Sequence, residues 1–227
     1  MQQAGFSRNN SVFPDLAFSF DVSRLINDSP RSGSSSRVCV SPMVYCHPDL
    51  WPVKNENAYR HYIAKLADVV QRLIESRCEI VLVASDTADN HAITDLRENL
   101  TQRMGPACLD WLQQPPVESV EDFLRHVSKG QLLIASRLHG VILSHLIETP
   151  ALALAYDRKV KSHMRVADQS DYCLSIDDFD VDQVLKLVAN LKATIADERS
   201  VIQGKNREFR QSLDAQYDGV LSGRSLK

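Results

Sequence analysis

An arginine and a histidine stand two residues apart, at Arg137 and His139, in a turn between two apolar runs. Arginine carries a planar, permanent charge whose paired N–H groups suit a carboxylate or a phosphate. Histidine is the side chain that most readily gains or loses a proton near neutral pH. With this spacing the two residues could hold an anion and move a proton at one site, so we take them as the candidate catalytic residues.

The runs around this turn predict how it is held. Residues 132–135 read as a buried strand, and 141–146 as the buried part of the helix that follows. Open α/β sheets bind ligands at the carboxyl ends of their strands, and the free N–H groups of a helix start favour an anion. Ser136 and Leu138 are therefore predicted to bind substrate in the same turn. A structural interpretation also stays open, in which Arg137 pairs with a structural carboxylate and His139 caps the helix.

A second polar cluster follows the next predicted strand, at residues 151–156. If the two strands are neighbours, both turns open on the same edge of the sheet. Residues 158–165, which follow this strand, include five side chains able to carry a positive charge. The net charge of the whole chain is −3, so an anionic ligand would explain this local excess of positive charge. A solvated basic loop is the alternative. The predicted substrate-binding residues here are Tyr156, Asp157, Lys159, Lys161 and His163, whereas His145 reads as a core histidine.

Composition sets the class of protein. The chain has 227 residues, of which 44% are hydrophobic and 24% charged, as in soluble globular proteins. Its net charge of −3 gives no basic field for nucleic acid. No apolar segment approaches the roughly 18–20 residues of a membrane span, and residues 1–10 lack a secretion signal. Five scattered cysteines suggest reduced thiols, so we expect a cytoplasmic protein that binds no nucleic acid.

Apolar runs alternate with amphipathic segments from Val38 onward. This pattern predicts an α/β fold, a Rossmann-like parallel sheet with helices on both faces. The strand at 38–44 should be central, between 79–84 and 132–135. We divide the chain into a link segment (1–37, with a serine-rich stretch at 29–36), a Rossmann-like domain (38–178) and C-terminal helices (179–227). The other predicted elements are a strand at 107–112 and helices at 56–77, 92–104, 119–127, 139–148, 180–196 and 200–217.

Several common motifs are absent from the sequence. It contains no G-x-G-x-x-G, P-loop, H-E-x-x-H or G-x-S-x-G pattern. Dinucleotide redox chemistry, P-loop hydrolysis, zinc peptidase activity and serine hydrolase activity therefore lose their usual support.

The turn at 136–140 and the segment at 150–159 together resemble the polysaccharide pyruvyl transferase family. That family carries an arginine-x-histidine turn before an apolar helix, and a following strand that ends in tyrosine-aspartate-x-lysine. Here these residues are Arg137, His139, Tyr156, Asp157 and Lys159. The segment from Pro14 to Phe18 also resembles a family segment near the link between two lobes.

The resemblance implies transfer of a pyruvyl (ketal) group from phosphoenolpyruvate to a sugar of a cell-surface polysaccharide or its lipid-linked precursor. It also implies one lobe of a glycosyltransferase B-like fold, here the second lobe. Residues 1–37 would then be the link or the remnant of a first lobe, and residues 38–178 the donor-binding domain, so we expect a transferase lobe with little activity by itself. The implied chemistry calls for no cofactor and no metal. Peripheral association with the inner face of the membrane and oligomer formation stay open.

Two other functions also stay open at this point. One is the donor lobe of a sugar-nucleotide glycosyltransferase, although many such enzymes carry two glutamates eight residues apart and this chain has no such pair. The other is a non-catalytic lobe that binds an anion or a saccharide.

Overall fold

A computed structural model describes residues 12–23 and 36–221 of the chain. Six parallel strands form one sheet in the order β3-β2-β1-β4-β5-β6. The central strand β1 pairs with β2 on one side and β4 on the other, which confirms the predicted α/β fold and the order of its middle strands. The strands are β1 (Arg37–Ser41), β2 (Glu79–Leu82), β3 (Leu112–Gln113), β4 (Leu132–Ala135), β5 (Ala151–Ala155) and β6 (Cys173–Ser175).

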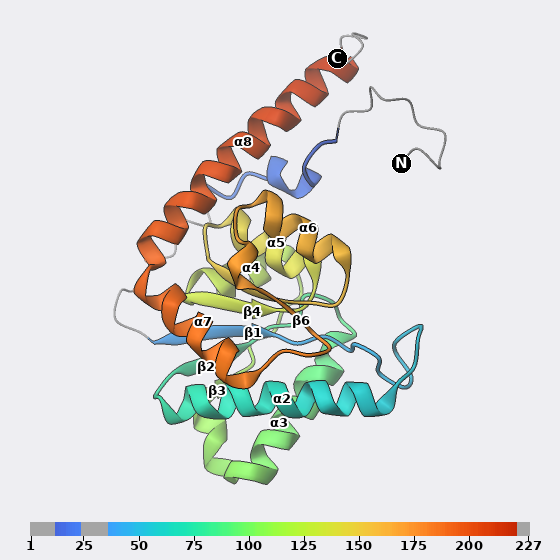
Figure 1. The fold of residues 1–227 in the computed structure, drawn as a ribbon, viewed down its shortest axis with the longest axis vertical. Coiled ribbons are helices and arrows are strands. Elements are labelled where there is room, and N and C mark those ends of the chain that lie inside the picture. The colour runs from blue at the N-terminus through green and yellow to red at the C-terminus, as the bar shows by residue number, and fades with distance from the viewer. Residues whose placement is uncertain (1–11, 24–35, 222–227) are drawn as a thin grey trace.

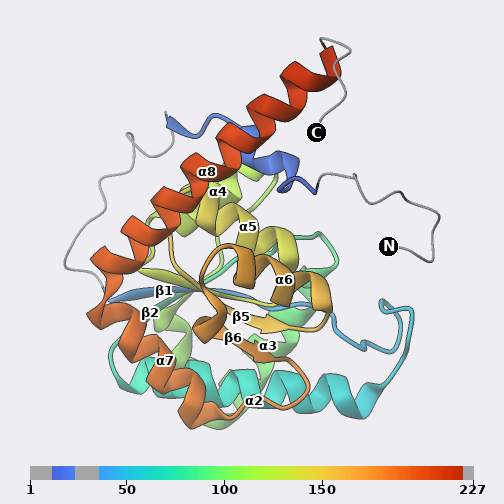
Figure 2. The ribbon, with the colours of Figure 1, turned by 45° about the horizontal axis from the view of Figure 1, so that its top comes forward.

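Helices cover both faces of the sheet (Figure 1). One layer contains α2 (Glu56–Glu75), α3 (Asp89–Met104) and α7 (Val181–Ala193). The opposite layer contains α4 (Val120–Ser128), α5 (Leu138–Leu146) and α6 (Arg158–Val166). The long helix α8 (Ile195–Leu221) runs over this second layer, and its far end extends past the body of the domain (Figure 2).

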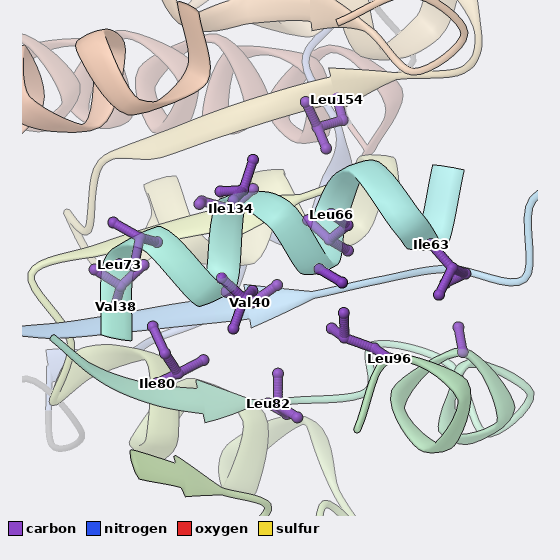
Figure 3. Packing of buried hydrophobic residues seen from close by; sticks show 14 of the residues in the cluster. Val38, Val40, Ile63, Leu66, Leu73, Ile80, Leu82, Leu96, Ile134 and Leu154 are labelled. Atoms are coloured by element: carbon purple, nitrogen blue, oxygen red, sulfur yellow. The ribbon is translucent and has the colours of Figure 1, made fainter. Parts of the chain in front are cut away.

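Successive strand residues face opposite layers, and both layers are buried. In β1, Val38 and Val40 pack toward α2, while Cys39 between them packs toward the α5 side. Ile134 of β4 and Leu154 of β5 extend the α2-side cluster across the sheet (Figure 3). Burial on both faces explains why the strands read as continuous apolar runs in the sequence.

The predicted strand at 107–112 is mostly wrong. A 3-10 helix, η3, occupies Pro106–Trp111, and only Leu112 and Gln113 pair with β2. Gly105 adopts a positive φ of 77°, and Pro106 then fixes the φ of the first residue of the turn. These two residues favour a turn over the extended chain that the apolar pattern indicated.

The basic segment after Tyr156 forms helix α6, so its interpretation as a loop is wrong. The Asp157 carboxylate accepts a hydrogen bond from the Lys159 backbone N–H at 2.6 Å and caps the helix. Val160, His163 and Met164 form the buried face, at the i, i+3, i+4 spacing of a helix. The sequence reading also missed β6, a short edge strand that is only half-buried.

The link segment returns to the domain next to α8. It contains the 3-10 turn η2 (Leu16–Ser19), which lies beside α8 and α5 (Figure 1). A third 3-10 turn, η4 (Ser170–Tyr172), precedes β6. Residues 29–35 of the predicted serine-rich stretch lie outside the described residues. In the part that is described, no helix is both long enough and apolar enough to cross a membrane.

Candidate functional site

Arg137 lies at the carboxyl end of β4, as predicted, and makes a two-point contact with a buried carboxylate. It is the N-cap residue of α5. Its Nε donates to Asp89 Oδ2 at 2.5 Å, and its Nη2 donates to Asp89 Oδ1 at 2.8 Å. Its Nη1 lies 3.7 Å from Asp86 Oδ2, and the side chain is 22% exposed. The carboxylate pairing of the structural interpretation is therefore present, and the partly exposed Arg137 side chain also lies beside the exposed Asp86.

Asp89 joins three segments of the chain. It is fully buried at the start of α3, and its Oδ1 also accepts a hydrogen bond from the Val44 N–H after β1. Burial raises the pKa of Asp89, although the hydrogen bonds from Arg137 and Val44 oppose that rise. Burial acts to lower the pKa of Arg137, but the hydrogen bonds and charge of Asp89 outweigh it and leave that pKa raised. The arginine consequently stays charged and is held rigidly.

His139 is on the first turn of α5 and faces a different neighbour. Its side chain is 68% exposed, and its Nε2 lies 3.7 Å from Asp15 Oδ2 in the link segment. It is not the helix cap, because Arg137 occupies that position and no side chain caps the helix among the described residues. The start of α5 therefore presents backbone N–H groups next to an exposed imidazole.

Ser136 and Leu138 shape the turn from inside. Ser136 is buried, and its hydroxyl lies 3.0 Å from the Tyr62 hydroxyl of α2. Burial raises the pKa of Tyr62 to about 12, so this phenol stays neutral. Leu138 is half-buried and packs against the core on the α5 side. The hydroxyl of Ser136 has a partner in the core, so its contribution to a site is to fix the path of the turn.

Tyr156 belongs to an aromatic cluster at the same edge. Its ring centroid lies 5.6 Å from that of Trp51 and 6.3 Å from that of Tyr45, both from the segment after β1. It follows β5 as Arg137 follows β4, and these two strands are paired in the sheet. The aromatic cluster and Arg137 are therefore neighbours.

His163 does not belong to the basic cluster, so that prediction is wrong. It is 8% exposed, and its Nε2 lies 3.1 Å from Nδ1 of His145. Burial lowers the pKa of His163 to about 4, so the ring is neutral at pH 7. Lys159 and Lys161 are exposed on α6. The predicted core position of His145 is confirmed, since it is 1% exposed.

A cavity of about 230 Å³ opens next to Asp86. It is lined by the loop after β2 and by the start of α4, including Asp86, Ser85, Thr87, Glu118 and Ser119. Arg137, His139 and Lys159 do not line it, so this cavity does not join the predicted site residues. Arg137 lies beside the cavity, since its Nη1 is 3.7 Å from Asp86 Oδ2.

Sequence reasoning missed three acidic residues of this site. Asp86 and Asp89 directly follow β2, so their nearness to the end of β4 depends on the sheet order. That strand order was predicted, and from it an acidic partner of Arg137 could have been sought among the residues that follow β2. No pattern in the sequence pointed from His139 to Asp15, because they are far apart in the chain and the link segment has no periodicity.

Comparison with known proteins gives a family and a fold. A family model described as polysaccharide pyruvyl transferase matches residues 1–158. No curated protein matches the chain. Among solved structures, a mutant O-GlcNAc transferase of Thermobaculum terrenum matches with a TM-score of 0.55 and 14% sequence identity. The match covers 82% of this chain and 36% of that chain, and at this identity it indicates a shared fold alone.

Proposed function

Because the chain belongs to the polysaccharide pyruvyl transferase family, we propose that it is the donor-binding unit of a pyruvyl transferase. The donor is phosphoenolpyruvate, and the acceptor is a sugar of a cell-surface polysaccharide or of its lipid-linked precursor. The observation that carries this proposal is the partly exposed Arg137, which is held by Asp89 and lies two residues before the exposed His139 at an uncapped helix start.

The proposed reaction needs a cation and a proton-transfer group. The methylene carbon of phosphoenolpyruvate gains a proton, and a sugar hydroxyl attacks the resulting positively charged carbon. Loss of phosphate and attack by a second hydroxyl complete the ketal. Of the two hydroxyl protons released, one balances the proton taken up by the methyl group and the other leaves with phosphate. Arg137 would hold a donor anion, and His139 would carry out a proton transfer.

Electrostatics at Arg137 set a condition on donor binding. The buried Asp89 already neutralises the guanidinium, and the half-exposed Asp86 lies 3.7 Å from its Nη1. A donor anion must therefore displace Asp86 from Nη1. The N–H groups at the start of α5 would add to the attraction for the anion.

The remaining candidate residues support this assignment to different degrees. Lys159 and Lys161 are exposed cations on α6 and would attract the donor. Tyr156 offers apolar ring surface beside Arg137 for the sugar, and Asp157 fixes the start of α6. Ser136 and Leu138 shape the turn.

We further propose the division into a link segment (1–37), a donor-binding domain (38–178) and C-terminal helices (179–227). A transferase of this kind needs a second wall to orient the acceptor and exclude water, and orientation can supply about 7–11 kcal/mol in favourable cases. The domain alone should then bind donor and transfer slowly. We place the enzyme in the cytoplasm, where a lipid-linked acceptor would bring it to the inner face of the membrane.

Thermal unfolding with three ligands tests the proposal, since a ligand stabilises only the state that it binds. We expect phosphoenolpyruvate to raise the midpoint more than phosphate does, and a nucleotide sugar to have little effect. His139→Gln should reduce the shift caused by phosphoenolpyruvate, whereas Arg103→Lys, in a surface ion pair with Asp68, should leave it unchanged. Protection by the nucleotide sugar alone would favour a glycosyltransferase lobe, and protection by none would overturn donor binding.

A further inference from the structure

The link segment carries a turn that is fixed on the α5 side of the domain. Phe18 is 1% exposed, and its ring centroid lies 4.8 Å from that of Phe209 in α8 and 6.0 Å from that of His163 in α6. Arg210 Nε also donates to the Phe18 carbonyl oxygen at 3.3 Å. Since both the ring and the backbone are held, the turn from Asp15 to Phe18 has a defined place beside α8 (Figure 1).

Asp15 uses its two carboxylate oxygens for different purposes. Oδ1 accepts a hydrogen bond from the Ala17 N–H at 2.9 Å, which caps the turn and fixes the orientation of the carboxylate. Oδ2 is thereby directed to His139, whose Nε2 lies 3.7 Å away. The His139 backbone is fixed in turn by α5, so both partners of this contact start from ordered backbone.

We infer that Asp15 is the positioning residue for His139, orienting Nε2 toward the link segment and leaving Nδ1 for the donor. The inference rests on the proposed function, in which His139 transfers a proton. A carboxylate beside one imidazole nitrogen selects the tautomer that carries its proton there and stabilises the ring when it becomes charged. The link segment would then complete the site and would not merely connect it to other parts of an enzyme.

The proposed proton transfer moves the Nδ1 proton of His139 to the donor. In the charged ring, the Nδ1–H bond breaks and a C–H bond forms at the methylene carbon of phosphoenolpyruvate. The electron pair of the Nδ1–H bond stays on Nδ1, and the ring becomes neutral with its remaining proton on Nε2, next to Asp15. A hydroxyl proton of the acceptor restores the charged ring.

Substitution of Asp15 by asparagine separates the positioning of His139 from the folding of the link segment. Asp15→Asn keeps a side-chain oxygen that can accept the Ala17 hydrogen bond, but it removes the charge that faces His139. Asp21 is a matched control, because its Oδ1 accepts a hydrogen bond from the Ser23 N–H at 2.9 Å in a similar turn of the same segment. Asp21→Asn changes the charge of the link segment by the same amount.

Long-range ¹H–¹⁵N NMR spectra of histidine-labelled full chain test the inference, with the His139 signals assigned from His139→Gln. We expect wild-type His139 to carry its neutral-form proton on Nε2, and Asp15→Asn to move the Nε2 and Nδ1 shifts toward each other while Asp21→Asn leaves them in place. Unchanged shifts in Asp15→Asn, or equal changes in both variants, would overturn the inference.

Titration with phosphoenolpyruvate separates this inference from the proposed function. If phosphoenolpyruvate perturbs the Nδ1 signal of His139 and Asp15→Asn does not alter the tautomer, the donor site stands and the positioning role fails. If Asp15→Asn alters the tautomer but phosphoenolpyruvate at millimolar concentration leaves His139 unperturbed, the proposed function fails, and the role of Asp15 in donor chemistry fails with it.

Discussion

Arg137 contacts Asp89 through two nitrogen atoms, and this pair joins the end of β4 to the start of α3. Since Asp89 also accepts a hydrogen bond from the Val44 N–H, the loop after β1 is held at the same point. The polar centre of the carboxyl edge is therefore part of the fold as well as of the candidate site. Substitutions here must be judged by stability and by binding together.

Asp89→Asn should destabilise the fold. The variant keeps the shape of the side chain but leaves the partly buried charge of Arg137 without its partner, a loss of about 3 kcal/mol in the free energy of unfolding. Urea unfolding at pH 7 would measure it. Asp68→Asn is the control, because the Asp68 pair with Arg103 is on the surface and should be worth below about 1 kcal/mol. Similar losses in both variants would show that the buried pair contributes no more to the free energy of unfolding than the surface pair does.

Asp86→Asn should strengthen donor binding. Asp86 is 45% exposed and lies 3.7 Å from Nη1 of Arg137, so it competes with an incoming anion. An exposed pair of this kind is worth roughly 0.2–1 kcal/mol, which corresponds to a gain in affinity of up to about fivefold. Titration calorimetry with phosphoenolpyruvate would check it. Weaker binding in Asp86→Asn would mean that Asp86 itself holds the ligand, and would contradict competition.

Lys159→Ala should weaken donor binding, because it removes a cation at the start of α6, where the helix follows the carboxyl end of β5. A loss of about two- to fivefold in affinity is expected for one exposed charge. Arg165→Ala is the control on the same helix, roughly 9 Å further along its axis at 1.5 Å per residue. Equal losses of donor affinity in the two variants would indicate that the positive charge of α6 as a whole attracts the donor, and that Lys159 makes no local contact with it.

The sheet was predictable because its pattern is local. Each strand of the 38–155 region that is buried on both faces reads as an apolar run, and the order around β1 follows from the usual rules of parallel sheets. Helix α6 was not predicted, because its many exposed charges obscure the helical spacing of its buried residues Val160, His163 and Met164. Strand β6 was missed because three half-buried edge residues give almost no pattern.

The site was predictable only in part, for a similar reason. The place of Arg137 follows from one strand and one helix, so the sequence was sufficient to put it at the carboxyl edge. Its partner Asp89 depends on the path of another loop, and the partner of His139 depends on where the link segment packs. His163 was assigned a charge because its burial against Phe18 cannot be read from a run of basic residues.

The stability of the protein should fall as the pH falls below about 6.5, because of the buried pair of His145 and His163. Burial lowers the pKa of His145 well below its usual value, with a further lowering from His163, and burial lowers the pKa of His163 to about 4. The unfolded chain therefore binds protons that the folded chain does not, so the free energy of unfolding rises with pH. Each histidine should contribute about 1.4 kcal/mol per pH unit below 6.5, and for His163 this slope should level off near pH 4.

Urea unfolding between pH 7.5 and pH 4.5, a range set to bracket the roughly 6.5 pKa of an unperturbed histidine, would measure this slope. His163→Gln should reduce the slope by about half, since the amide can still form a hydrogen bond with His145 but takes up no proton, while His145 keeps its own contribution. His61→Gln, at an exposed histidine of α2, is the matched control and should leave the slope unchanged. A slope that is the same in wild type and His163→Gln would show that acid sensitivity arises elsewhere in the protein.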